Sequence, residues 1–173
     1  GLGLIVVKGV RIMPANLMAR RSLLGLLASV LLLMGAGQPS PTHAAALRQE
    51  PLEITTSKAT IRFTVEVADT EETRNRGMMY RKSLAPDRGM LFDFKTPREA
   101  AFWMRNTLIP LDIIFITQDG RILTIARNAV PHSEVPIPSG GVIRGVLELA
   151  GGRAAQLGIY PGDRVKHRIF KRD

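Results

Sequence analysis

The sequence predicts a mainly β, α+β domain: a compact antiparallel β-sandwich or barrel that carries two short helices. Three observations support this fold class. Apolar and polar residues alternate in several short segments, which is typical of strands with one buried face. An Asp-Gly pair lies between two β-branched segments, as in a hairpin. Strands do not alternate with long helices along the chain, so a doubly wound parallel sheet is not expected.

Seven short strands are expected. They cover residues 61–67, 89–94, 101–104, 111–117, 121–126, 142–149 and 165–169. The alternation is clearest from Ile61 to Val67 and again from Val165 to Ile169. Asp119 and Gly120 form the expected hairpin turn between the fourth and fifth strands.

Two short helices are expected between these strands. The first begins at Asp69 or Thr70, with Glu72 completing a capping box three residues after Asp69, and ends at Gly77. The second spans residues 152–157. The chain after position 46 is long enough to bury a continuous core without disulfide bonds.

The N-terminal segment has the pattern of a secretory signal peptide. Arg20 and Arg21 precede an apolar run over residues 23–36, and small residues at Ala44 and Ala46 suit a cleavage site. The run is shorter than the roughly 20 residues that span a bilayer. We therefore expect an exported chain, periplasmic or extracellular, cleaved after Ala46 or Ala44. An uncleaved membrane anchor is the alternative.

The predicted domain organisation follows from this assignment. Residues 1–46 hold the signal peptide and upstream residues without a fold, residues 47–52 are a tether, and residues 53–171 form a single β-rich domain. The arginine pair also resembles a twin-arginine signal, so the export route is left open. Contact with a membrane is expected only through an uncleaved signal segment.

Composition excludes several classes of function. The chain has no cysteine, so disulfides, thiolate nucleophiles and cysteine-based metal sites are excluded. Four of the 24 basic residues and none of the 15 acidic residues precede position 47, and elsewhere the charges are interspersed. Such a distribution lacks the basic patch of a nucleic-acid-binding protein, so no nucleic-acid partner is expected. No dedicated metal site or cofactor is expected, although a carboxylate-bound calcium ion is left open.

The densest group of chemically useful residues lies around the only tryptophan. Trp103, Arg105, Asn106 and Asp112 fall within ten residues, near a strand end and the following turn, where binding loops are often found. A structural alternative is that Trp103 fills the core, Asn106 bonds the turn backbone and Asp112 accepts from neighbouring amides. Both interpretations stay open at this stage.

Further candidates are charged. Arg76 lies in an arginine-rich segment that also contains Arg74 and Arg81, and paired guanidinium groups suit carboxylate, phosphate or sugar-acid ligands. Alternatively, one of these arginines bridges to Glu66 or Glu148. Glu148 shares a strand face with apolar residues, so its role depends on which face is buried.

Several motifs resemble, in order and spacing, a bacterial and archaeal "domain of unknown function" family, numbered 192. These motifs are Glu66-x-Ala68-x-Thr70, Arg74 with Arg76-Gly77-Met78-Met79-Tyr80-Arg81, Gly89-Met90-Leu91-Phe92, Phe102-Trp103-Met104-Arg105-Asn106-Thr107, Pro110-Leu111-Asp112, Val146-Leu147-Glu148-Leu149 with Gly151, and Gly162-Asp163. The resemblance extends from about Leu52 to Phe170. It implies a compact, jelly-roll-like β domain, often exported or membrane-tethered, and it implies no established reaction.

Three functions are compatible with the sequence. The preferred one is a non-catalytic binding module for a small polar, anionic or carbohydrate ligand, held by Arg76, Trp103, Arg105, Asn106, Asp112 and Glu148. The second is an envelope hydrolase in which Asp112 and Glu148 act as general acid and base. The third is a structural partner of an envelope complex. The sequence does not predict an oligomeric state.

Overall fold

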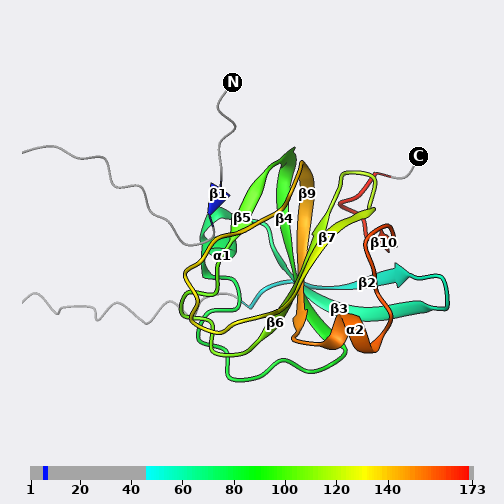
Figure 1. The fold of residues 1–173 in the computed structure, drawn as a ribbon. Coiled ribbons are helices and arrows are strands. Elements are labelled where there is room, and N and C mark those ends of the chain that lie inside the picture. Colours follow the sequence, from blue (N-terminus) through cyan, green and yellow to red (C-terminus); the bar gives the residue numbers. More distant parts are fainter. Residues whose placement is uncertain (1–5, 8–45, 172–173) are drawn as a thin grey trace, which may run out of the picture. The chain divides into compact units, whose positions relative to one another are not determined.

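The structure is a computed structural model that describes residues 6–7 and 46–171. By its contacts the chain divides into two units, and each helix and strand of the described residues belongs to the unit made of residues 1–10 and 47–173. The elements are β1 (Val6–Val7), β2 (Gln49–Thr55), β3 (Thr60–Ala68), α1 (Glu71–Arg76), β4 (Arg88–Arg98), β5 (Ala100–Phe102), β6 (Leu111–Ile116), β7 (Ile122–Ala129), β8 (Ile137–Pro138), β9 (Ile143–Ala150), α2 (Arg153–Gln156) and β10 (Arg164–Lys166) (Figure 1).

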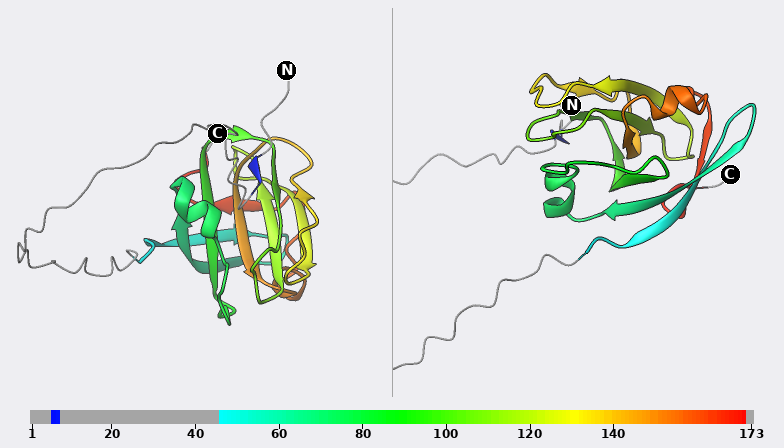
Figure 2. Two further views of the ribbon diagram at one scale, coloured as in Figure 1. Left: turned by 90° about the vertical axis from the view of Figure 1, so that its left-hand side faces the viewer. Right: turned by 90° about the horizontal axis from the view of Figure 1, so that it is seen from below.

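The fold is mostly β, as predicted. Seven strands form one sheet in the order β10-β2-β3-β4-β9-β6-β7, and a small second sheet has the order β1-β5-β8. The large sheet curls, as Figure 2 shows. Near its two ends, Val165 N–H donates to the Gly120 carbonyl at 2.7 Å, and Ile122 N–H donates to the Asp163 carbonyl at 2.9 Å. The curled sheet is therefore a half-barrel whose terminal strands meet at this point.

One pair of strands in the large sheet departs from the expected antiparallel arrangement. β3 and β4 are parallel, with Thr64 opposite Arg88 and Ala68 opposite Phe92. Parallel neighbours need a crossover connection, which α1 and the loop after it provide. Because α1 has only six residues, the sequence pattern did not indicate a βαβ unit.

Two further expectations are corrected near the N-terminus. The segment from Gln49 to Leu52, expected to be a tether, is part of β2 and pairs with β3 along its whole length. Residues 1–46 were expected to have no fold, yet Val6–Val7 form β1 beside Ala100 and Ala101 of β5. Residues 8–45, which include all of the predicted signal peptide except Ala46, lie outside the described residues. No helix in the described part of the chain has the length and apolar character that crossing a membrane requires.

The helices form where expected, with one change at a cap. Thr70 is the N-cap of α1, and its capping box is completed by Thr73 rather than by Glu72 after Asp69. The Thr73 hydroxyl accepts from the backbone amide of the N-cap residue Thr70. The Thr70 hydroxyl accepts in turn from the Thr73 amide at 3.1 Å. α2 follows Gly152, which has a left-handed φ of 81°.

Two apolar clusters lie on the two faces of the central strands β4, β9 and β6. Leu91, Leu147 and Ile114 belong to the first cluster, whereas Val146 and Ile113 belong to the second. These strands are therefore buried on both faces, which explains their nearly continuous apolar sequences. Any polar residue within them is placed in the interior.

Candidate ligand-binding site

Three loops that are far apart in sequence meet beside the second apolar cluster. We call their common surface the Trp103 loop surface, residues 76–81, 103–108 and 130–135. The Tyr80 amide donates to the Asn106 carbonyl at 2.9 Å, and the His132 amide donates to the Thr107 carbonyl at 3.1 Å. Backbone hydrogen bonds thus hold the three loops together.

The backbone of this surface is strained at three places. Tyr80, Asn106 and His132 have φ values of 65°, 53° and 62°. Left-handed conformations are uncommon outside glycine, although asparagine and histidine tolerate them better than tyrosine does. Such strain persists only where the surroundings enforce it, and it concentrates at functional sites. This strain supports the Trp103 loop surface as a candidate site.

The side chains of Trp103 and Arg105 lie next to each other on this surface. The Arg105 guanidinium carbon is 5.4 Å from the centroid of the indole ring, within the range of a cation–π contact. Arg105 also lies 3.7 Å from a carboxylate oxygen of Glu134, and both of these side chains are at least half exposed. The indole Nε1 is shielded from solvent and has no hydrogen-bond acceptor among the described residues. Arg105 therefore offers exposed donors that are not fully used within the protein, whereas the indole N–H is covered by neighbouring atoms.

Large apolar side chains are exposed on the same three loops. Tyr80 is 60% exposed, Leu108 39%, Val130 66% and Val135 70%. Exposed apolar groups of this size, when they gather on one surface, are typical of a ligand- or partner-binding region.

Asp112 is not available to a ligand. Its side chain is fully buried, and its carboxylate accepts from the backbone amides of Asn128 at 2.8 Å, Gly152 at 3.0 Å and Ala154 at 2.7 Å. The bonds from Gly152 and Ala154 satisfy amides at the start of α2, and the bond from Asn128 ties the carboxylate to β7. Of the two interpretations of Asp112 that the sequence left open, the structure therefore supports the structural one.

Glu148 lies on the opposite face of the sheet from Asp112. Asp112 is directly opposite Leu149, whereas Glu148 is directly opposite Ile113. Because successive side chains of a strand point to opposite faces, the two carboxylates are separated by the sheet itself. Glu148 is also fully buried. The general acid and base pair postulated for a hydrolase is therefore not formed, and Glu148 does not line the Trp103 loop surface.

The remaining predicted residues are found near the loops. Asn106 is half-buried and contributes its carbonyl to the Tyr80 amide. Arg76 is exposed at the end of α1, four residues before Tyr80. Arg81 forms a salt bridge with Glu66, one of the two partners that the sequence left open for an arginine of this segment. Its Nη1 is 2.6 Å from a carboxylate oxygen of Glu66. Of the six predicted binding residues, Arg76, Trp103, Arg105 and Asn106 belong to the Trp103 loop surface.

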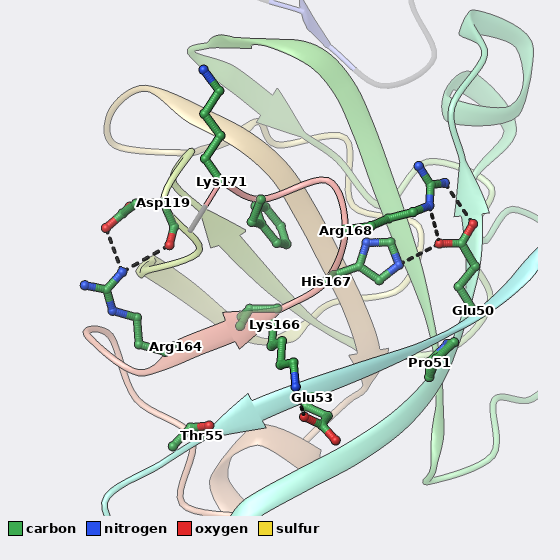
Figure 3. Close-up of a pocket in the computed structure, with 12 residues that line it drawn as sticks. Glu50, Pro51, Glu53, Thr55, Asp119, Arg164, Lys166, His167, Arg168 and Lys171 are labelled. Atoms are coloured by element: carbon green, nitrogen blue, oxygen red, sulfur yellow. Dashed lines mark hydrogen bonds and ion pairs between the residues drawn. The ribbon is translucent and has the colours of Figure 1, made fainter. Parts of the chain in front are cut away.

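A second feature, which the sequence did not indicate, is a charged groove along β2, β10 and the C-terminal residues (Figure 3). Its volume is about 1030 Å³. Arg168 donates to both carboxylate oxygens of Glu50, at 2.7 and 2.8 Å, and His167 Nε2 is 2.9 Å from Glu50. On the other side of the groove Arg164 pairs with Asp119 at 2.9 Å.

Charge in this groove is largely satisfied within the protein. Hydrogen bonds from Arg168 lower the pKa of Glu50 to about 2. Burial of the carboxylate opposes this shift, and a hydrogen bond from Arg48 adds to it. Burial lowers the pKa of His167, against the raising effect of Glu50. His167 Nδ1 accepts from the Ile169 amide at 3.4 Å, so Nε2 carries the proton that faces Glu50. Through these contacts His167 fastens the C-terminal segment to β2.

In residues 46–171 no three His, Cys, Asp or Glu side chains are placed to share a metal ion. The absence of a metal or cofactor remains a prediction from the sequence.

The chain is similar to proteins of one family and to solved structures. Residues 52–167 match the family DUF192, described as "Uncharacterized ACR". A proposed transcription regulator from Sinorhizobium meliloti 1021 is 46% identical, with a TM-score of 0.69, over 70% of this chain and 95% of that one. A protein of unknown function from Novosphingobium aromaticivorans DSM 12444 is 41% identical, with a TM-score of 0.70, over 81% of this chain and 100% of that one.

The family match confirms the resemblance noted from the sequence motifs. No curated protein matches the chain. Since the match covers most of the β-rich domain, this chain belongs to the DUF192 family.

Proposed function

We propose that the domain is a non-catalytic binding module, and that the Trp103 loop surface binds a small anionic, acceptor-rich ligand such as a sugar acid. The observation that carries the proposal is the half-exposed Arg105 guanidinium, whose carbon lies 5.4 Å from the centroid of the Trp103 ring. A ligand with hydrogen-bond acceptors would bind this guanidinium.

Arg105 determines the expected charge of the ligand. Its guanidinium lies beside the indole, and its contact with Glu134 at 3.7 Å is longer than a hydrogen bond. A carboxylate could accept a pair of hydrogen bonds from the planar guanidinium. The apolar faces of Tyr80 and Leu108 offer contact area for a carbon ring.

Binding is preferred to hydrolysis because the two candidate carboxylates are separated by the sheet. Glycoside hydrolysis by an acid and base pair requires carboxyl groups about 5 to 10 Å apart across a shared cleft. Asp112 is buried against backbone amides, and Glu148 faces the second apolar cluster. Neither supports an acid or base role at the Trp103 loop surface.

The test uses the fluorescence of Trp103, which is the only tryptophan in the chain. Its emission therefore reports on this surface alone. Glucuronate, glucose and inorganic phosphate are titrated separately at constant ionic strength. We expect a saturable change with glucuronate and a weaker one, or none, with glucose.

Two variants decide the outcome. Arg105→Gln should raise the Kd for glucuronate about tenfold or more, because a charged hydrogen-bond donor is lost. Arg121→Gln, which changes an exposed arginine of the hairpin, serves as the matched control and should stay within twofold of the unchanged protein. The proposal fails if no probe changes the emission, or if both variants bind alike.

We also propose that the domain acts outside the cytoplasm, as the basic and apolar N-terminal pattern suggests. The mass of the chain recovered from a periplasmic or culture fraction should correspond to cleavage after Ala46 or Ala44. Recovery of the uncleaved chain from the cytoplasmic fraction alone would contradict this assignment.

A protein partner in the cell envelope is the second candidate function, and the exposed Tyr80 and Val135 side chains favour it. A stoichiometric companion should then co-purify with the domain and be lost from a Tyr80→Ser, Val135→Ser double variant. Retention of the companion by the double variant would count against this surface.

A further inference from the structure

A smaller cleft lies over strands β2, β3 and β4. Its volume is about 280 Å³. We call it the Arg81 cleft, and its polar residues are Gln49, Thr64, Glu66, Arg81, Ser83 and Arg88. Of these residues only Arg81 also falls within the Trp103 loop surface, and the ligand contacts proposed there do not involve it.

The strand register explains why these residues converge. Gln49 of β2 is directly opposite Glu66 of β3, and Thr64 of β3 is directly opposite Arg88 of β4. The crossover that makes β3 and β4 parallel brings Arg81 and Ser83 over the same strands. The cleft is therefore a product of the one parallel pair in the large sheet.

The two arginines of the cleft differ in how their charge is balanced. Arg81 Nη1 is 2.6 Å from a carboxylate oxygen of Glu66. Arg88 Nη1 donates to the neutral side-chain amide of Gln49 at 2.9 Å. No carboxylate in the described part of the chain lies within 4.0 Å of Arg88. The cleft therefore holds two guanidinium groups and one carboxylate.

Most hydrogen-bond donors in the cleft are still available. A guanidinium has five N–H groups, and each arginine uses only one of its nitrogens in the contacts above. The hydroxyls of Thr64 and Ser83 make no hydrogen bond with residues 46–171. The lining thus presents many more donors than acceptors.

From this arrangement we propose that the Arg81 cleft binds a small oxyanion, a carboxylate or phosphate group on a molecule no larger than a monosaccharide. Donor-only guanidinium groups match acceptor-only oxyanions in both charge and geometry. A volume of about 280 Å³ is at the lower limit of small-molecule sites. The bound anion competes with Glu66 for Arg81 and supplies the counter-charge for Arg88.

The competition with Glu66 gives the proposal a distinctive test. Calorimetric titrations of the full chain use inorganic phosphate and succinate as probes, with ionic strength held constant by chloride. Arg88→Gln should raise the Kd of the bound probe about tenfold, because a charged donor is lost. Glu66→Gln should lower the Kd at least threefold, because a competing carboxylate is removed. A merely structural role for Glu66 would not strengthen binding.

Two controls locate the effect. Arg62→Gln, an exposed arginine of β3 that pairs with Glu53 outside the cleft, should change the Kd by less than twofold. Trp103→Phe should leave the titration unchanged, which separates this site from the Trp103 loop surface. Saturation by phosphate alone or by succinate alone identifies the anion class.

The proposal is overturned by any of three results: saturation by neither probe, equal affinities for Arg88→Gln and the unchanged protein, or weaker binding by Glu66→Gln. A failure of glucuronate to change the Trp103 emission does not affect it, since the Arg88→Gln and Trp103→Phe variants assign the calorimetric signal to the Arg81 cleft.

Discussion

The Tyr80 amide donates to the carbonyl oxygen of Asn106 at 2.9 Å, and both residues are held in the left-handed region, at φ values of 65° and 53°. A single hydrogen bond thus joins two strained residues from loops that are 26 positions apart in sequence.

Asn106→Ala should destabilise the domain by about 1 to 2 kcal/mol, because alanine has a Cβ but no side chain that tolerates the left-handed conformation. Asn106→Gly should be neutral within about 0.5 kcal/mol, because glycine adopts this conformation without strain. Chemical denaturation of the two variants measures the difference. Equal free energies of unfolding would show that the backbone at this position is not strained.

Asp112→Asn should destabilise the domain by about 2 to 4 kcal/mol. The amide nitrogen of asparagine would replace one of the two oxygens that accept from Gly152 and Ala154, so a donor would face a donor. Asp87→Asn is the control, because Asp87 is exposed. Urea denaturation of both variants is the measurement, and equal stability would contradict the role of Asp112 at α2.

Gly89→Ala should cost about 1 to 3 kcal/mol, because an added Cβ would lie 2.8 Å from the Glu148 carbonyl oxygen. That oxygen belongs to the strand paired with β4 and cannot move without disturbing the sheet. Gly141→Ala is the control, since its nearest neighbour is the flexible end of Leu123 at 3.1 Å. Thermal denaturation should show a large shift only for the Gly89 variant.

Stability should fall in two separate steps on acidification. The pKa of His167 is lowered from 6.5 by burial, so the unfolded chain binds a proton that the folded chain does not, and stability decreases as the pH falls below 6.5. The pKa of Glu50 is lowered from 4.5 to about 2, so its contribution is intact above pH 4.5 and is lost between those values. Glu50, Arg168 and Asp93 are the charged groups that act on His167.

His167→Gln should remove the first step and leave the step below pH 4.5. Urea midpoints of the unchanged protein and the variant, measured between pH 7.5 and 3.5, test this expectation. The slope above pH 4.5 is the informative quantity, since the variant is also expected to lower stability at every pH. Identical slopes in the two proteins would exclude His167 as the titrating group.

Much of the fold could be predicted because the alternating strands carry a local signal. The segment from Ile61 to Val67 lies within β3, and Asp119 and Gly120 form the turn between β6 and β7. β2 was missed because Gln49, Glu50 and Pro51 are polar or strand-breaking residues. Its pairing with β3 involves contacts between separate strands, which no local pattern records.

The residues proposed for the candidate site differ in how far the sequence alone can place them. Trp103, Arg105 and Asn106 are neighbours in sequence, so the sequence alone placed them together. The placement of Asp112 and Glu148 depends on the register of β6 against β9. A shift of one residue would put both carboxylates on the same face, and nothing in a single sequence distinguishes the two registers.

The meeting of β10 with the start of β7 also bears on solubility. An uncovered terminal strand offers its free amides and carbonyls to other molecules and invites aggregation. Here Val165 bonds to Gly120, and Ile122 bonds to Asp163, so each end of the large sheet shields the other over this stretch. A truncation that removed the chain from Asp163 onward would therefore expose unpaired backbone groups at both ends of the large sheet. The truncated protein should then self-associate.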